Sequence, residues 1–260
     1  MTLVRRIEHL LEGSPLEPMA RRVYQHVHAI GRPRAQQSLR YDRDTARIMA
    51  RVLRTDSSCA DVGAHRGSLL EIMLRLAPGG RHFAFEPVPE LAATLRRRFP
   101  EAEVHQVALS DASGQSTFHH VVEDPGLSGL RRLPKVKPDA AVREITVSTR
   151  RLDEMIPPDV TLRFLKVDVE GAQLQVLRGG SETIRRCRPT IVFEHGYLAQ
   201  ETYATTSAMV WDLLVQQLGL QISRLADWLG GAPALTSEAF DASVGLHADS
   251  EFCFVAHPAA

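Results

Sequence analysis

Acidic residues stand at the predicted carboxyl ends of five successive strands. They are Asp61, Glu86, Asp111, Asp168 with Glu170, and Glu194. The carboxyl ends of parallel strands meet at one edge of a sheet, and ligands of open α/β sheets bind outside that edge. Crowded carboxylates repel one another and lose hydration, so a purely structural sheet gains nothing from them. The pattern therefore predicts a binding site for a positively charged ligand.

The turn after the first predicted strand narrows the choice of ligand. It reads Asp-x-Gly-x-x-x-Gly, with Asp61, Gly63 and Gly67. A dinucleotide site needs Gly-x-Gly-x-x-Gly, so that backbone N–H groups can receive a pyrophosphate. Here the middle glycine is missing, and Asp61 would lie close to the phosphate charge. S-adenosylmethionine, a nucleoside with a cationic tail and no phosphate, suits this turn better, and Glu86 has the spacing expected of a carboxylate that binds ribose hydroxyls. An NAD-dependent oxidoreductase is the alternative with the same fold.

Strand and helix signals alternate from residue 57 onwards. Apolar runs predict strands at residues 57–64, 81–87, 102–111, 115–124, 162–171 and 189–196. Helical periodicity predicts helices at residues 67–77, 89–100, 172–187 and 207–219, with two glycines weakening the third. Residues 144–156 read as a strand running into a short helix, and residues 220–225 and 251–258 as a terminal pair of strands. This alternation is typical of a parallel, doubly wound sheet.

Composition sets limits on partners and location. Lys plus Arg and Asp plus Glu both number 31, so the net charge favours neither nucleic acid nor a membrane surface. The three cysteines form no CxxC pair, which fits a reducing compartment. No apolar run approaches the roughly 18 residues of a membrane span, and the first residues lack a secretory signal. We therefore expect a cytoplasmic protein, either a monomer or a homo-oligomer.

The chain is expected to have two parts. Residues 1–55 are predicted to form a helical N-terminal extension, and residues 56–260 a cofactor-binding domain. The first 54 residues hold eleven Arg and no Lys. We interpret this as a solvated helical face rather than an arm that binds a polyanion.

Six segments carry a family resemblance. In chain order they are DVGAHRG, FAFEPVPE, VALSDASG, VSTRRLDEMI, FLKVDVEGAQLQVLRGG and IVFEHG. Between about residues 59 and 196 the chain resembles the FkbM family of S-adenosylmethionine-dependent methyltransferases. The resemblance implies the class I methyltransferase fold: a Rossmann-like, doubly wound, mostly parallel α/β sheet of seven strands with helices on both faces. It also implies O-methylation of a hydroxyl of a sugar, glycan or secondary metabolite. A non-catalytic cofactor-binding protein is the non-enzyme alternative.

The resemblance also assigns cofactor contacts by position. Asp61, Gly63 and Gly67 would line the methionine part, Glu86 would hold the ribose, and residues 106–110 would border the adenine. The complete set of predicted cofactor residues is Asp61, Gly63, Ala64, His65, Gly67, Glu86, Pro87, Gln106, Ala108, Ser110 and Asp168. The family usually has Asn where this chain has His65, and often where it has Gln106, but both side chains can still donate hydrogen bonds.

Catalytic roles are predicted for the ends of the last two parallel strands. His195 is the candidate base, because a neutral imidazole at the ligand edge can accept a proton at neutral pH; a histidine that caps the strand is the alternative. Asp168 and Glu170 flank one residue, so in an extended chain they would face the same side. One would orient His195 or bind the acceptor, and the other would face the amino group of the cofactor. Asp168, Glu194 and His195 could instead hold a metal ion, but no ligand spacing demands it and no metal is predicted.

Acceptor contacts are predicted for Ser128, Glu194 and Lys166. Ser128 lies in the Gly/Pro/Lys/Arg-rich segment 125–141, which we interpret as a lid. Its basic residues would meet an anionic acceptor or be solvated. Lys166 would either reach the acceptor or pair with Asp168.

Overall fold

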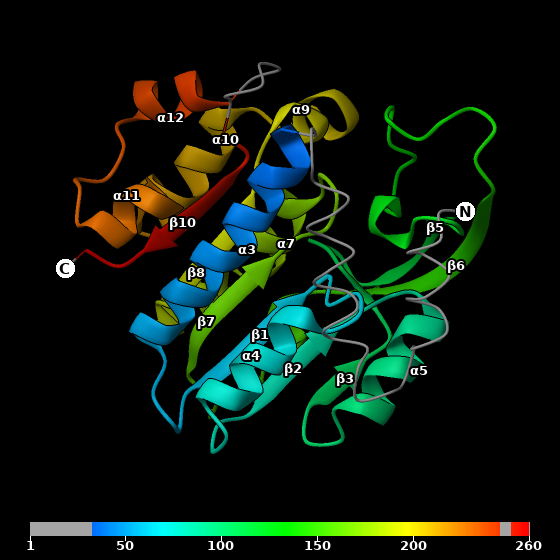
Figure 1. Ribbon diagram of the computed structural model, residues 1–260, viewed down its shortest axis with the longest axis horizontal. Helices are drawn as coiled ribbons and strands as arrows, with labels where there is room; N and C mark the ends of the chain where they lie inside the picture. Colours follow the sequence, from blue (N-terminus) through cyan, green and yellow to red (C-terminus); the bar gives the residue numbers. More distant parts are fainter. Residues whose placement is uncertain (1–32, 245–250, 260) are drawn as a thin grey trace. The chain divides into compact units, whose positions relative to one another are not determined.

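The computed structural model describes residues 33–244 and 251–259. Its main sheet has seven strands in the order β3-β2-β1-β7-β8-β10-β9 (Figure 1). They are β1 (Ser58–Val62), β2 (His82–Phe85), β3 (Glu103–His105), β7 (Leu162–Val167), β8 (Thr190–Glu194), β9 (Gln221–Arg224) and β10 (Cys253–His257). Five neighbouring strands run parallel, namely β3, β2, β1, β7 and β8. Strand β10 runs antiparallel to both β8 and β9. The predicted fold class and terminal strand pair are confirmed.

Helices alternate with the strands. They are α3 (Pro33–Val52), α4 (Ser68–Leu76), α5 (Pro89–Arg98), the 3₁₀ turn η1 (Pro125–Leu127), α6 (Leu152–Met155), α7 (Gln173–Gly179), α8 (Ser181–Cys187), α9 (Tyr197–Tyr203), α10 (Ser207–Trp211), the π-helix η2 (Asp212–Gln217), α11 (Leu225–Gly230) and α12 (Ser237–Ser243). The helix predicted over 172–187 is interrupted at Gly180, and the one over 207–219 changes to π geometry after Trp211. None of the helices described is long and apolar enough to cross a membrane.

The pleat of the strands divides the buried side chains between the two faces of the sheet. In β2, Ala84 packs in a cluster with residues of α4 and α5, whereas Phe83 and Phe85 join the large core on the other side. In β8, Ile191 and Phe193 belong to that large core as well. The same alternation determines which polar side chains at the strand ends share a face of the sheet.

A second sheet of three strands corrects one prediction. Its order is β4 (Ala108–Leu109), β6 (Val142–Arg150), β5 (Gly114–Val121). The third strand of the main sheet thus ends at His105 and not at Ser110-Asp111. Ala108 is instead buried against Phe118 and Val147 of the second sheet. Asp111 therefore does not end a strand of the main sheet.

The chain divides into two compact units within α3, at Thr45 and Ala46. Residues 33–52 of the predicted N-terminal extension are helical, and its residues 1–32 lie outside the described part of the chain.

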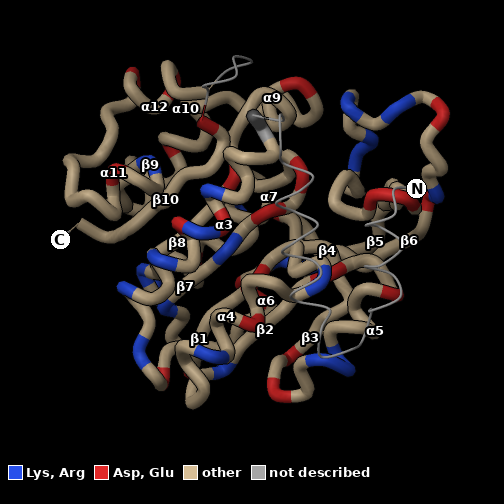
Figure 2. The backbone as a smooth tube through the Cα atoms, in the orientation of Figure 1, with Lys and Arg blue, Asp and Glu red and all other residues tan. Residues whose placement is uncertain are grey.

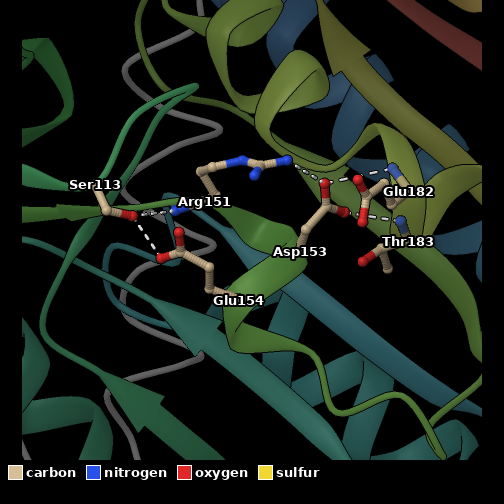
Figure 3. Close-up of polar contacts among 6 residues, drawn as sticks. All are labelled: Ser113, Arg151, Asp153, Glu154, Glu182 and Thr183. Carbon is tan, nitrogen blue, oxygen red and sulfur yellow. Dashed lines mark hydrogen bonds and ion pairs between the residues drawn. The ribbon is translucent and has the colours of Figure 1, made fainter.

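The segment VSTRRLDEMI (residues 147–156), one of the six that carry the family resemblance, ties the second sheet to α8 (Figure 3). Oδ1 of Asp153 accepts the N–H of Thr183 at 2.8 Å, and Oδ2 lies 2.9 Å from Nη2 of Arg151. Glu154, next along the chain, accepts a hydrogen bond from the Ser113 hydroxyl. The Asp153 side chain is 7% exposed, so it caps the first turn of α8 out of reach of most water.

Asp153→Ala is expected to lower the free energy of unfolding by about 1–2 kcal/mol, because it leaves N–H groups in the first turn of α8, among them the part-buried one of Thr183, without their acceptor. Urea unfolding followed by circular dichroism measures this change. Glu154→Ala is the matched control, and we expect it to stay within about 0.5 kcal/mol of the parent. Equal losses in the two variants would contradict the capping role.

Candidate functional site

The turn between β1 and α4 is built around residues with left-handed backbone conformations. Gly63 has φ 76°, His65 φ 50° and Gly67 φ 81°. A Cβ on Gly63 would lie 1.9 Å from the carbonyl oxygen of Asp168, so only glycine lets the ends of β1 and β7 approach this closely. The two predicted glycines therefore have structural reasons to be there. Gly63 brings the β1–α4 turn, which we call the first turn, against the Asp168 backbone.

Lys166 joins these two strand ends electrostatically. It pairs in register with Asp61, and both point away from the large core because their neighbours along each strand fill it. Its Nζ lies 2.8 Å from the Gly63 carbonyl oxygen, 3.3 Å from Oδ1 of Asp61 and 3.3 Å from Oδ2 of Asp168. Burial lowers the pKa of Lys166, but attraction by Asp61 and Asp168 outweighs it and the pKa is raised. Of the two predicted roles, this geometry favours the pairing over a contact with the acceptor.

The Asp61 side chain is more deeply buried than a side chain that contacts the cofactor needs to be. Its side chain is 1% exposed. Burial raises the pKa of Asp61, and Lys166 opposes that rise. Asp61 thus helps to keep Lys166 charged, and its contact with the cofactor stays a prediction.

Glu86, at the end of β2, ties its strand to the first turn. One carboxylate oxygen accepts the N–H of His65 at 2.8 Å, and the other accepts the N–H of Val88 at 3.0 Å. Burial raises the pKa of Glu86 to about 7, although both N–H groups oppose the shift. A carboxylate oxygen has further lone pairs to accept a hydroxyl, so this arrangement fits the predicted contact with ribose.

Three carboxylates lie near one another at the ends of β7 and β8, and we call Asp168, Glu170 and Glu194 the acidic edge. Burial, then the charges of Asp168 and Glu170, raise the pKa of Glu194 well above its usual value. Burial also raises the pKa of Glu170 to about 7. Glu170 has φ 50°, an unusual conformation for a residue with a side chain. The structure therefore brings together three of the acids that the sequence predicted.

A lysine that sequence reasoning did not assign to the site completes this edge. Nζ of Lys135 lies 2.9 Å from Oε2 of Glu170. Lys135 belongs to the loop between β5 and β6, residues 122–141, where several basic residues gather (Figure 2). The basic composition of this loop was visible in the sequence. The partner of Lys135 was not, because Glu170 lies 35 residues further along the chain.

His195 does not reach the acidic edge. It follows Glu194 on a strand with alternating faces, and its ring stacks on Phe240 of α12 with centroids 5.5 Å apart. Nε2 lies 3.3 Å from the hydroxyl oxygen of Ser207, and the residue is 3% exposed. Burial lowers the pKa of His195 to about 4. The geometry thus argues against the predicted base, and it does not assemble the alternative metal set of Asp168, Glu194 and His195. Among the residues described, no group of three or more His, Cys, Asp or Glu side chains is arranged to hold a metal ion.

Ser128 uses its hydroxyl for a contact within its own segment, although its neighbour Gly129 lies beside Glu170. Its Oγ accepts the N–H of Val121 at 3.0 Å, and the residue is buried. This bond ties the first residues of the 122–141 loop to the end of β5, so the hydroxyl has a structural partner where a contact with the acceptor was predicted.

The remaining predicted cofactor residues are dispersed around the first turn and the end of β3. Ala64 is buried beside α4 and α5, and Pro87 follows Glu86 directly. Gln106 is exposed after β3, whereas Ala108 is buried in β4. The carbonyl oxygen of Ser110 lies against Gly179, where a Cβ would be 2.0 Å away. The border with adenine stays a prediction.

Comparison with known families decides what kind of protein this is. The family model described as the methyltransferase FkbM domain matches residues 61–221, which include β1, the first turn and the acidic edge. The chain belongs to the FkbM methyltransferase family. The predicted resemblance is thereby confirmed, and with it S-adenosylmethionine as the cofactor of the family. The dinucleotide alternative loses its basis.

Individual relatives are similar over part of the FkbM chain. The 2-O-methyltransferase NoeI of Sinorhizobium fredii is 31% identical over 159 residues, which are 54% of this chain and 64% of that protein. Methyltransferase 1 of Beauveria bassiana is 31% identical over 147 residues, 48% of this chain and 58% of that protein. The chain therefore spans less than two thirds of the length of these curated relatives. The crystal structure of an FkbM methyltransferase from Methylobacillus flagellatus is 18% identical, with a TM-score of 0.48, over 79% of this chain and 44% of that one.

The site of this FkbM protein suits the charge of S-adenosylmethionine. When all are ionised, Asp61, Glu86 and the acidic edge carry more negative charge than Lys166 and Lys135 offset. A sulfonium and an ammonium group would lower this repulsion, whereas a diphosphate would increase it. When bound, the cofactor would supply an activated methyl group on sulfur.

Proposed function

We propose that this FkbM protein is an S-adenosylmethionine-dependent O-methyltransferase acting on a hydroxyl of a sugar, glycan or secondary metabolite. The observation that carries the proposal is the acidic edge beside the first turn, where carboxylates with raised pKa values gather. The name of the NoeI relative, a 2-O-methyltransferase, supports transfer to oxygen.

The chain's own residues would contribute alignment and proton removal. Gly63, Glu86 and Asp168 would hold the cofactor beside the strand ends, and alignment of two reactants can contribute about 7–11 kcal/mol. A hydroxyl acceptor must also lose a proton, and a positioned base contributes roughly 10²–10⁴-fold in rate.

We take Glu170, a member of the acidic edge, as the base in place of His195. A general base works best when its pKa lies near the working pH, and burial raises the pKa of Glu170 to about 7. His195, the base predicted from sequence, is enclosed on the other face of the sheet. Burial and the charges of Asp168 and Glu170 raise the pKa of Glu194 well above its usual value, and in its protonated form Glu194 could donate a hydrogen bond to the acceptor.

Calorimetry with S-adenosylmethionine and with its demethylated product tests the cofactor, and mass spectrometry of a panel of saccharides and phenolic or polyketide alcohols tests the reaction. We expect binding of both cofactor forms and the gain of one methyl group on at least one hydroxyl. Absence of binding would contradict the whole proposal. Tight binding without any methylated product would instead indicate a non-catalytic cofactor-binding protein.

A further inference from the structure

The loop between β5 and β6 brings a cation to the proposed base. The Lys135 ammonium lies 2.9 Å from Glu170, and the two side chains are 32% and 19% exposed. A fully exposed ion pair contributes little, but partial enclosure reduces screening and strengthens the interaction. The position of Lys135 therefore matters for the charge of Glu170.

The loop holds this lysine in place with a small core of its own. Leu133 and Val136 on either side of Lys135 are buried together with Val121. A lysine between two buried neighbours has little freedom to move its backbone away from the site.

A second anchor joins the loop to α9. Nη1 of Arg131 donates to the Thr202 carbonyl oxygen at 2.8 Å, and its guanidinium lies 5.0 Å from the centre of the Tyr203 ring. The same ring packs against Gly171, where a Cβ would be 2.9 Å from it. The loop, α9 and the Glu170-Gly171 turn are thus linked to one another, and the loop is docked at the site.

We propose that Lys135 is a positioning residue for methyl transfer, which holds the Glu170 carboxylate ionised and in place to accept the proton of the acceptor hydroxyl. This inference rests on the proposed function. In this role a basic residue of the loop acts on Glu170 of the protein itself. The sequence had predicted that the basic residues would contact solvent or an anionic acceptor.

The charges around Glu170 explain why one lysine has this effect. Lys135 lowers the pKa of Glu170, whereas Asp168 and Asp124 raise it. Glu194 adds a third carboxyl group near Asp168 and Glu170, and Lys166 is already engaged by Asp61 and Asp168. Tyr203 is a neutral neighbour, because burial raises its pKa to about 12. Without Lys135, Glu170 would face mainly carboxylates, and it would be protonated at neutral pH.

The test compares Lys135→Met with Lys137→Met, which removes the same charge from an exposed position two residues along the loop. In Lys135→Met we expect the midpoint of the rise in kcat with pH to move upward by about 1–3 pH units, since a nearby opposite charge shifts a carboxyl pKa by that amount. Lys137→Met should leave the midpoint unchanged, and Lys135→Arg should restore it. Urea unfolding and the Kd of S-adenosylmethionine show whether the variants fold and bind.

A carbon-13 NMR titration of the Glu170 carboxyl group gives a readout that needs no acceptor. Its midpoint should rise in Lys135→Met and stay unchanged in Lys137→Met, and an unmoved midpoint overturns the role of Lys135. If the parent protein methylates no acceptor, the proposed function fails and the role falls with it. If the parent transfers methyl while Lys135→Met keeps the parent pH profile, the role of Lys135 alone is overturned.

Discussion

Replacing Lys166 with Met is expected to lower the free energy of unfolding by about 3–5 kcal/mol, the usual effect of removing one partner from a buried ion pair. The loss is large because Asp61 is 1% exposed and would be left as a buried charge, and because the Gly63 carbonyl would lose its donor. Affinity for S-adenosylmethionine should fall with it, since Lys166 fixes the first turn against Asp168. Urea unfolding and calorimetry measure the two effects.

Two further variants make the Lys166 result interpretable. The double variant Asp61→Asn, Lys166→Met removes the buried Asp61 charge together with its Lys166 partner, so it should recover part of the lost stability. Arg163→Met, on the same strand, removes an exposed cation that donates to the Val52 carbonyl oxygen at 3.2 Å, away from the site, and this control should change stability far less. A Lys166→Met protein as stable as the parent would show that the three contacts do not hold the strand ends together.

Glu170→Gln is expected to lower kcat by roughly 10²–10⁴-fold, the contribution of a positioned general base. The Kd of S-adenosylmethionine should change far less, because the substitution leaves the first turn intact. In the parent protein the base must be ionised, so kcat should rise with pH through about 7 and level off above it. This rise should be lost in the variant.

His195→Gln is the companion to Glu170→Gln, because it removes the base predicted from sequence. It should keep the pH profile of the parent and lose mainly stability, since the ring packs against Phe240 and contacts Ser207. If His195→Gln abolished the pH-dependent rise while Glu170→Gln preserved it, the assignment of the base would be reversed.

The main strands could be predicted because apolar runs ending in acids or glycine mark buried parallel strands. Cys59 to Val62 and Phe164 to Val167 are such runs, and both lie where the sequence placed them. The third strand was extended too far because Ala108-Leu109 is equally apolar. Whether a short apolar pair joins one sheet or another depends on partners distant in the chain, here Thr149 and Arg150.

The site was predictable where local rules apply and not where tertiary contacts decide. Alternation along a strand could have separated His195 from Glu194, because consecutive side chains face opposite sides. Lys135 could not have been found in this way, since nothing within its own loop indicates that Glu170 lies opposite. Ser128 gave no local sign that its hydroxyl would bind the N–H of Val121.

The position of β10 in the main sheet has a consequence for how the chain is made. β9 lies at the edge of the sheet and hydrogen-bonds to β10, which separates it from β8. During synthesis β9 leaves the ribosome before β10, so it waits without its neighbour while β8 keeps an unpaired edge. Such edges favour misassociation. We therefore expect this half of the sheet to form late and to benefit most from chaperones while the chain is still growing.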